Sequence, residues 1–555
     1  MRSWFMAFIL IVGLVGCDSS EQTPPASDAE NPLEAALPNL FEANIGTVNF
    51  PVRCTADAAR VVERGLTLLH HMMYENARLA FGMAENLDGN CPLALWGQAM
   101  TIIHPLWPDR PTAQELTLCN DLARRATAMA AGDPREAGYL STVSVYFANL
   151  PEETERDRLA RFAEAWQKVA TDNPTDLEAQ ALFALAYLAT AELSDKSLVK
   201  NQRAGDIATR ILQQVPDHPG AHHYLIHAYD HPQLAARALP VADRYGAMTP
   251  AVPHATHMMT HIYTRLGQWR KSVEWNQKSA DSAWELCTEL GEILPHYQHA
   301  LDYLAYAHLQ MGHDSRVLEI VDDLSSLEAP FSTLNRASAA YAFAALPARY
   351  NLERADWIAA AELKPRTPSG FPWEETHDPY VAITHFARAM GNAKLGRSAR
   401  ARLEIQRLAE LREAILPNSA YWGLQVEIQM LSAQAWTQYA EGTPERALAT
   451  MQQAVELEAA TEKSPTTPGA VLPAMELLGD MLSAIGDYTA ALEAYERSLT
   501  QSPGRLNSLY GAAQAAEAAE LNAVAAKYYT ATLAMLSDST ERTAIIRAAR
   551  TYLEG

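Results

Sequence analysis

The sequence carries little positive charge. Its 555 residues include 66 Asp and Glu against 44 Lys and Arg, which gives a formal net charge of −22, and no cluster of basic residues interrupts this acidic background. Binding to nucleic acid needs a basic face that neutralises phosphates. We therefore expect no nucleic-acid partner, and the acidic charge by itself indicates mainly solubility.

Cysteine is also scarce, with five residues in the chain. No two of them have the close spacing of a zinc knuckle or of a thioredoxin-like redox site. Cys54 and Cys91 each come just before a predicted helix and are expected at the same end of an up-down-up arrangement. In an oxidising compartment they can form a disulfide. The alternative is a pair of free buried thiols, which is a common environment for cysteine.

The familiar catalytic motifs are missing. The sequence has no glycine-rich phosphate loop, no Gly-x-Ser-x-Gly nucleophile elbow and no His-Glu-x-x-His zinc-protease motif. The segments HYLIH and HMMTH have two histidines four residues apart, but no glutamate between them to act as a base. The chain is therefore not assigned as an enzyme, and any catalytic role is expected to depend on a metal.

Long apolar runs are absent except at the N-terminus. There Arg2 precedes an apolar stretch from Trp4 to Gly16 that is too short to cross a bilayer as a folded helix, and it predicts a signal peptide over residues 1–16. The stretch ends in Leu14-Val15-Gly16-Cys17, which resembles the lipobox of bacterial lipoproteins, in which the cysteine thiol receives a diacylglycerol. The alternative is a chance cysteine in an uncleaved anchor.

The lipobox implies a location in the cell envelope. Residues 17–50 are polar in their first half, contain prolines and should form a flexible tether behind the lipidated Cys17. The folded body should then lie on the periplasmic side of a membrane. Asp18 beside the lipid favours the inner over the outer membrane if the sorting rule of enteric bacteria applies.

Alternating strand patterns are missing as well, and helical periodicity covers almost the whole chain. In the clearest unit, Gly479 lets two helices approach, Gly486-Asp487-Tyr488 forms the turn, and Tyr495 packs the second helix back. These residues at these intervals resemble the tetratricopeptide pattern, whose period is about 34 residues. A second unit has its turn at Gly267-Gln268-Trp269.

Helical pairs of this kind stack into a curved solenoid with a concave face. We therefore expect an all-α tetratricopeptide-like superhelix interrupted by stretches rich in proline and glycine. The expected organisation is an N-terminal solenoid with a histidine-rich concave face over 51–362, a Pro-rich interruption over 363–379, middle helical repeats over 380–461 and C-terminal repeats over 462–555.

The wider sequence resembles a bacterial family of large tetratricopeptide-repeat proteins that is generally left without an assigned activity. Phrases such as CPLALWGQAMTIIHPLW, PGAHHYLIHAYDHPQLAARALPVADRYG and HALDYLAYAHLQMG carry this resemblance, which extends over most of the chain from about residue 50. The resemblance implies a helical solenoid and says almost nothing about chemistry.

Histidine is abundant and unevenly placed. Eight of the 17 histidines lie between His218 and His261. His223 and His257 are 34 residues apart, as are His227 and His261, so each pair should occupy equivalent positions on successive first helices of the repeats. Within each helix the two histidines are four residues apart, which places them on one face.

Paired imidazoles on neighbouring helices can converge on one metal ion, because such helices pack about 8–10 Å apart. Zinc, copper, iron and nickel all accept imidazole ligands. The expected ligands are His223, His227, His257 and His261, with His254 as an additional candidate. Asp230 is expected either as a further ligand or as a residue that orients one. More distant candidates on the same ligand face are His70, His104, His231, His299 and Asp302.

Three functions are compatible with this pattern. The leading one is a membrane-anchored scaffold that binds a peptide, a protein or a small ligand on its concave face, which rests on analogy with the fold. The second is a metal-binding protein or metal-dependent enzyme, and the third is a metal carrier without catalysis. Histidines that only cap helices, pack or face solvent are the structural alternative to all three.

Overall fold

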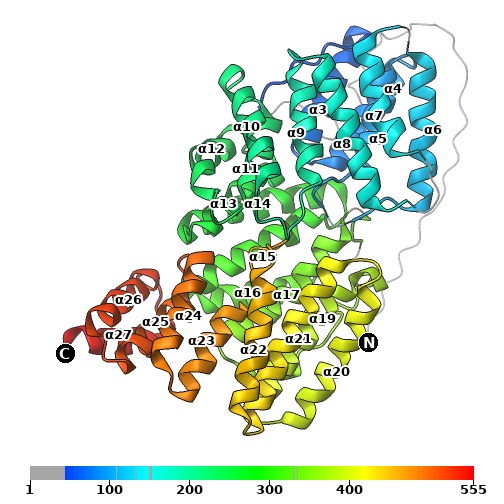
Figure 1. Ribbon diagram of the computed structural model, residues 1–555. Coiled ribbons are helices and arrows are strands. Elements are labelled where there is room, and N and C mark those ends of the chain that lie inside the picture. Colours follow the sequence, from blue (N-terminus) through cyan, green and yellow to red (C-terminus); the bar gives the residue numbers. More distant parts are fainter. Residues whose placement is uncertain (1–43, 108, 131, 149–152, 329, 334) are drawn as a thin grey trace, which may run out of the picture.

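The computed structural model describes residues 44–555 except 108, 131, 149–152, 329 and 334. This part consists of helices joined by turns and loops (Figure 1), and its one β feature is an isolated bridge between Ile293 and Phe331. The predicted all-α class is confirmed. The predicted signal peptide, Cys17 and most of the expected tether lie outside the described residues. Within the described part, no helix is both long and apolar enough to span a bilayer.

The helices form two blocks, which Figure 1 colours blue to green and green to red. The first block contains α3 (Ala56–His70), α4 (Tyr74–Leu87), α5 (Pro92–Met100), α6 (Ala113–Met129), α7 (Pro134–Tyr146), α8 (Glu155–Asp172), α9 (Leu177–Ala189), α10 (Val199–Gln214), α11 (Pro219–Tyr229), α12 (Ala235–Met248), α13 (Pro253–Arg265) and α14 (Trp269–Leu290). The second contains α15 (Pro295–Gln310), α16 (Asp314–Ser325), α17 (Arg336–Glu353), α18 (Trp357–Glu362), the 3-10 helix η1 (Glu375–His377), α19 (Asp378–Lys394), α20 (Ser398–Ile415), α21 (Ala420–Ala440), α22 (Pro444–Ala459), α23 (Ala474–Ile485), α24 (Tyr488–Gln501), α25 (Leu506–Ala518), α26 (Asn522–Met535) and α27 (Thr543–Glu554). Most helices pack mainly against a neighbour along the chain, as in a solenoid of helical hairpins.

The repeat predicted most clearly from the sequence is formed by α23 and α24. A Cβ atom at Gly479 would lie 2.7 Å from the ring of Tyr495, so only glycine allows this close approach of the two helices. Gly486 ends α23 with a φ of +86°, a left-handed conformation that glycine adopts without strain. The side chain of Asp487 then caps α24 by accepting a hydrogen bond from Ala490 N. The small residues, the turn and the packing aromatic thus have the predicted roles.

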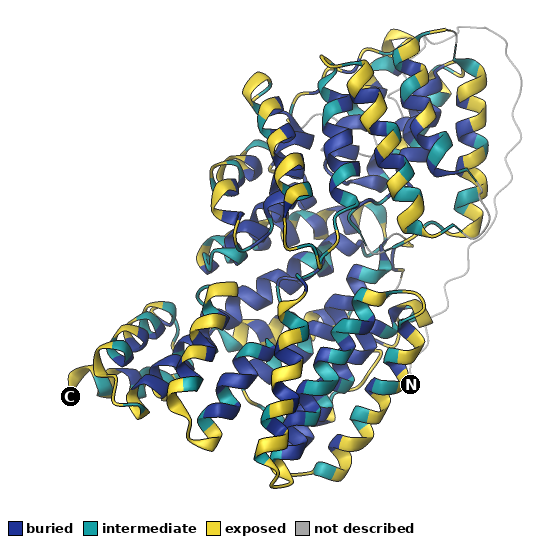
Figure 2. Cartoon of the chain, viewed as in Figure 1, coloured by how far each residue is buried: buried dark blue, intermediate teal, exposed yellow. Residues whose placement is uncertain are grey.

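Each block is built around its own large hydrophobic core. One extends from Ile45 to Leu294 and the other from Ala280 to Ala549, so the two overlap in sequence where α14 is followed by α15. Figure 2 shows buried residues on the helix faces that are turned toward neighbouring helices and exposed residues on the outer faces. Stacking through apolar faces is the packing of a tetratricopeptide-like solenoid.

The loop between α22 and α23, residues 460–473, reaches back to the first block, and we call it the crossing loop. Glu462 N donates to Leu193 O (2.8 Å), and Lys463 Nζ lies 2.7 Å from Asp230 Oδ2. On the side of the second block, Arg349 donates to Gly469 O (2.9 Å). Residues that the sequence marks as a break between repeats therefore also join the two blocks.

Cys54 and Cys91 form a disulfide in the structure. It connects the segment before α3 with the residue that precedes α5, so the two cysteines lie at the same end of three consecutive helices. Cys119 and Cys287 are free and buried.

Candidate metal centre on three successive helices

Three helices that carry the candidate residues begin with the same local signal. Pro219, Pro253 and Pro295 occupy the first turn of α11, α13 and α15, where the missing N–H costs no hydrogen bond and the fixed φ of proline suits the helix. The fourth residue after each proline is His223, His257 or His299, the eighth is His227, His261 or Tyr303, and the first is Gly220, His254 or His296. The repeat therefore places histidines at equivalent positions of neighbouring helices.

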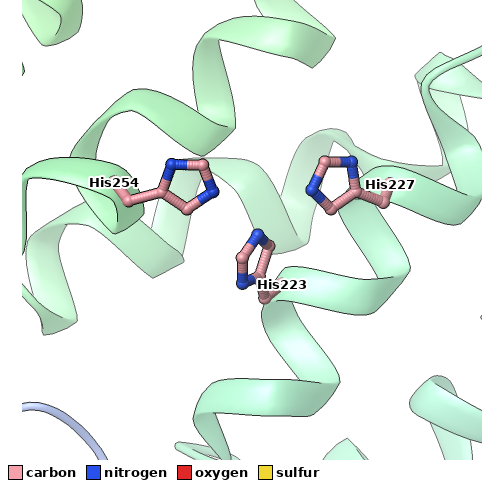
Figure 3. Close-up of side chains that lie close together, drawn as sticks. All are labelled: His223, His227 and His254. Carbon is pink, nitrogen blue, oxygen red and sulfur yellow. The ribbon is translucent and has the colours of Figure 1, made fainter. Parts of the chain in front are cut away.

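His223, His227 and His254 form a first group, which we call the 223 triad (Figure 3). All three are buried, and one ring nitrogen from each lies within 4.8 Å of the others. His223 Nδ1 is 2.7 Å from the carbonyl oxygen of His70, so Nδ1 carries the proton and Nε2 keeps its lone pair. Among the described residues, nothing hydrogen-bonds to His223 Nε2, to His254 Nε2 or to either nitrogen of His227. Buried nitrogens without partners are rare, and four at one place indicate a position for a ligand.

His257, His261 and His299 form a second group, the 261 triad, with ring nitrogens again within 4.8 Å of one another. His257 Nδ1 lies 2.8 Å from Asn276 Oδ1, and the Asn276 amide nitrogen donates to Ser272 O (2.8 Å), so the oxygen of Asn276 is the acceptor for His257. His261 Nδ1 lies 2.9 Å from the carboxylate of Asp230. Both Nδ1 atoms therefore carry protons, and both Nε2 atoms present lone pairs.

These two lone pairs face each other, because the Nε2 atoms of His257 and His261 are 3.1 Å apart. Two lone pairs at that separation repel unless a proton or a metal ion lies between them. Two imidazole nitrogens that bind one zinc ion at about 2.0–2.1 Å in tetrahedral geometry are about 3.3 Å apart. The observed separation is therefore close to that of two ligands of one ion.

Burial keeps the imidazoles of both triads neutral. It lowers the pKa of His223 to about 3. Burial also lowers the pKa of four other histidines well below the ordinary value, and neighbouring histidines add to the shift. These four are His227, His254, His257 and His299. The pKa of His261 is lowered too, since burial outweighs its hydrogen bond to Asp230. Neutral imidazole is the form that binds metals, so the two triads are in the protonation state that a metal requires.

Asp230 lies behind the 261 triad and not among its ring nitrogens. Its Oδ2 atom accepts from His261 and from Lys463 Nζ (2.7 Å), and its Oδ1 atom accepts from Arg265 Nε (2.8 Å). Burial alone would raise the pKa of Asp230, but Lys463, Arg265 and His261 hold it well below its usual range. A carboxylate at the far nitrogen of a histidine orients the ring and raises its basicity, which is the arrangement around many metal sites.

A cavity of about 20 Å³, roughly the space of one water molecule, lies between the triads. His227 and His254 line it from one triad, and His261 and His299 from the other. The crossing loop covers it with Pro465 and Thr466, and Tyr303 OH holds this loop by donating to Thr467 O (2.8 Å). Most of the histidines expected on an open concave face are thus covered, because a distant loop folds over them, and His299 stays half-buried.

A third group, which we call the 178 network, is built differently. His70 Nε2 lies 2.7 Å from Glu178 Oε2, and His218 Nε2 lies 3.4 Å from the same oxygen. The two Nδ1 atoms have hydrogen-bond partners, since His70 Nδ1 bonds to Tyr224 OH (2.8 Å) and His218 Nδ1 accepts from Ala221 N (3.1 Å), whereas His218 Nε2 has only the longer 3.4 Å approach to Glu178. Burial would raise the pKa of Glu178, but the hydrogen bonds from His218 and His70 hold it below its ordinary value.

Three of the more distant candidates are held in ion pairs outside the triads: His104 with Asp109, His231 with Glu462, and Asp302 with Arg349. Two others, His70 and His299, lie in the 178 network and in the 261 triad. Burial raises the pKa of Asp302 to about 6, and its ion pair with Arg349 offsets this only in part.

Sequence reasoning missed three residues of the site. His296 lines the cavity, and its ring centroid is 5.2 Å from that of His254. It directly follows Pro295 as His254 follows Pro253, and this equivalence could have identified it. Asn276 and Lys463 have no such signal, because they reach the histidines only through the packing of α14 and of the crossing loop.

A larger pocket, with a volume of about 380 Å³, lies between the crossing loop and the second block. Its aromatic lining includes Tyr306, Tyr341, Tyr421 and Trp422, and its charged lining includes Arg265 and Lys463. We call it the aromatic groove. Its volume is in the range of small-molecule sites. Arg265 and Lys463 also bind Asp230, so these two side chains connect the groove with the 261 triad.

No family model and no curated protein matches this sequence. Among solved structures, the human IFIT1 dimer with m7Gppp-AAAA shares 12% identity, with 90% of this chain and 94% of that chain covered and a TM-score of 0.37. The human IFIT1 dimer with PPP-AAAA shares 13% identity, with 72% and 73% covered and a TM-score of 0.32. The APC/C hetero-tetramer Cut9-Hcn1 shares 14% identity, with 93% and 80% covered and a TM-score of 0.35. Likeness at this level supports no functional conclusion, and the description of the fold rests on the helices themselves.

Proposed function

We propose that this protein is a cell-envelope solenoid that binds a transition-metal ion through His257, His261 and His299. The observation that supports this most directly is the 3.1 Å approach of the Nε2 atoms of His257 and His261, whose Nδ1 atoms are hydrogen-bonded to Asn276 and Asp230. Three neutral imidazoles with an open fourth position form a donor set used for zinc, and copper and iron also accept imidazole.

Elemental analysis tests this proposal. The full-length protein is extracted with detergent and purified without a His tag or chelator, and it is expected to contain stoichiometric zinc, copper or iron. The His257→Ala/His261→Ala variant should lose that metal. His385→Ala is the matched control, because His385 lies in the second block, where it bonds to Glu404 (2.7 Å). This variant should retain the metal.

Two results would contradict the proposal. One is a protein that contains no metal and takes up none from zinc, copper or iron salts. The other is a bound metal that persists in the His257→Ala/His261→Ala variant. Either result would direct attention from the 261 triad to the aromatic groove.

The aromatic groove supports a second candidate function, the binding of a peptide or a small organic ligand. Its volume of about 380 Å³ and its six aromatic side chains suit such a ligand. Native mass spectrometry of the purified protein should then show a co-purified adduct. The Gln425→Trp variant, which places a large side chain in the groove lining, should lack it, whereas an adduct unchanged in this variant would exclude the groove.

The proposed location rests on the lipobox-like segment Leu14 to Cys17 and on the Cys54–Cys91 disulfide, a bond typical of oxidising compartments. Labelled palmitate should be incorporated into the wild-type protein, which should sediment with the inner membrane. Cys17→Ala should abolish both the labelling and the lipid anchor. A wild-type protein without label would refute the anchor while leaving the metal site untouched.

A further inference from the structure

We infer that the protein binds a second transition-metal ion in the 223 triad, so that six histidines form a dinuclear centre. This inference rests on the proposed function of the 261 triad but uses different side chains. The two triads adjoin: the ring centroids of His227 and His261 are 5.5 Å apart, and those of His254 and His257 are 6.2 Å apart.

The 223 triad has its own reason to bind an ion. The carbonyl oxygen of His70 fixes the proton of His223 on Nδ1, which leaves Nε2 as a metal ligand. In the described part of the chain, His223 Nε2, His254 Nε2 and both nitrogens of His227 have no hydrogen-bond partner, and no hydrogen bond links the three rings. An ion confined to the 261 triad would leave all of these nitrogens uncompensated in the interior.

A trapped water molecule does not remove this cost. The small cavity is lined by His227 and His254, but His223 is not part of its lining. Water in the cavity could therefore serve two of the three rings and would leave His223 Nε2 without a partner. An ion bound by all three rings compensates one nitrogen of each, including His223 Nε2.

The cavity has the position of a bridging ligand. It lies between His227 and His254 on one side and His261 and His299 on the other. The two ions of dinuclear sites are about 3.5–4 Å apart, which leaves room for one bridging oxygen. Six neutral imidazoles supply no negative charge, so we expect an anionic bridge such as hydroxide. The all-imidazole donor set favours copper or zinc over magnesium, calcium or manganese, which prefer oxygen ligands.

Metal counting tests the inference. The full-length protein is incubated with Zn²⁺ or Cu²⁺ and desalted, and two ions per chain are expected. The His227→Ala/His254→Ala and His257→Ala/His261→Ala variants should each retain one ion, and the variant that combines all four substitutions should retain none. Circular dichroism checks folding, and glutamine at the same positions replaces alanine where an alanine variant does not fold.

Electron paramagnetic resonance provides a second readout on the copper-loaded protein. Two Cu²⁺ ions joined by a hydroxide bridge couple, so the wild-type signal should account for much less spin than the bound copper. In each double variant the remaining ion is isolated, and its spin should equal its copper content. Full spin in a wild type that binds two ions would overturn the bridged centre.

The possible counts separate this inference from the proposed function. One ion in the wild type that persists in His227→Ala/His254→Ala overturns the second site and leaves the proposed function intact. One ion that is lost in both double variants also overturns it, because a single ion then spans the two triads. No ion in the wild type overturns both.

Discussion

The 178 network and the 261 triad contain similar side chains in a different order. In the 178 network, Glu178 lies between His70 and His218, and both imidazoles are directed at its carboxylate. In the 261 triad, Asp230 lies behind His261, and the Nε2 atoms of His261 and His257 are directed at each other. In the 178 network, ring N–H donors face a carboxylate acceptor. In the 261 triad, two ring nitrogens that are both acceptors face each other.

This difference teaches that the number of clustered histidines does not decide their role. Their role depends on which ring nitrogen of each histidine is already hydrogen-bonded to another protein group. Where the carboxylate lies between the rings, it is the acceptor that both imidazoles face, and we expect the group to serve the fold. Where the carboxylate and Asn276 take the far nitrogens, the near nitrogens are left for an ion. Variants that affect one group and spare the other can test the distinction.

The largest expected effect is that of Glu178→Ala. Removing a buried carboxylate that two histidines face should weaken the packing of α9 and α11 by about 1–3 kcal/mol for each buried donor that is left without an acceptor. Hydrogen–deuterium exchange of peptides from these helices measures the loss, and it should be the same with and without zinc. Glu164→Ala, on the exposed side of α8, is the control. Unchanged protection in Glu178→Ala would mean that the 178 network does not hold the fold.

Zinc should stabilise the protein through the triads alone. Zinc at about 100 times its dissociation constant should raise the free energy of unfolding by about 2.7 kcal/mol. The shift should appear in the wild type and in Glu178→Ala, and the contribution of the 261 triad should vanish in His257→Ala/His261→Ala. Urea unfolding with zinc or with a chelator measures it. An equal shift in all three proteins would locate the zinc elsewhere.

A smaller effect is expected from Asn276→Ala. Without the Asn276 oxygen the proton of His257 is no longer fixed on Nδ1, and metal affinity should fall about 10–100-fold, as for other residues that orient metal ligands. Competition with a chromophoric chelator measures the affinity, and the exchange of α9 should stay unchanged. Gln277→Ala, at the next position of α14, should leave the affinity as it is. An affinity unaffected by Asn276→Ala would argue against the assigned orientation of His257.

The sequence predicted the solenoid well, because each repeat is specified by residues close together in the chain, such as Gly479, Gly486 and Tyr495. It also brought His223, His227, His257 and His261 together, since a 34-residue period places equivalent positions side by side. It did not predict that the histidines are covered. The crossing loop lies more than 160 residues beyond Tyr303, which holds it, and such a long-range contact leaves no periodic pattern. The position of Asp230 behind His261 likewise depends on Lys463 and Arg265, which only the fold brings near.

A change at His71 separates burial from metal binding. His71 is buried like the histidines of the 223 triad, but both its nitrogens have partners, Tyr245 OH (2.7 Å) and Ile45 O (2.8 Å). Burial lowers its pKa to about 3. The unfolded chain, with a histidine pKa of about 6.5, then binds one more proton than the folded protein between these values. Stability from this residue is complete above about pH 6.5 and falls by about 1.4 kcal/mol for each pH unit as the pH drops toward 3.

His71→Phe keeps a ring beside Tyr245 and removes the titrating group. Its free energy of unfolding should therefore depend less steeply on pH between about 4 and 6 than that of the wild type, by about one proton. Urea unfolding in the presence of a chelator measures both slopes, and added zinc should leave their difference unchanged. Parallel slopes would mean that His71 is protonated in the folded protein. A difference between the slopes that changes with zinc would connect His71 with the metal centre, which would contradict its assignment as a residue satisfied by Tyr245 and Ile45.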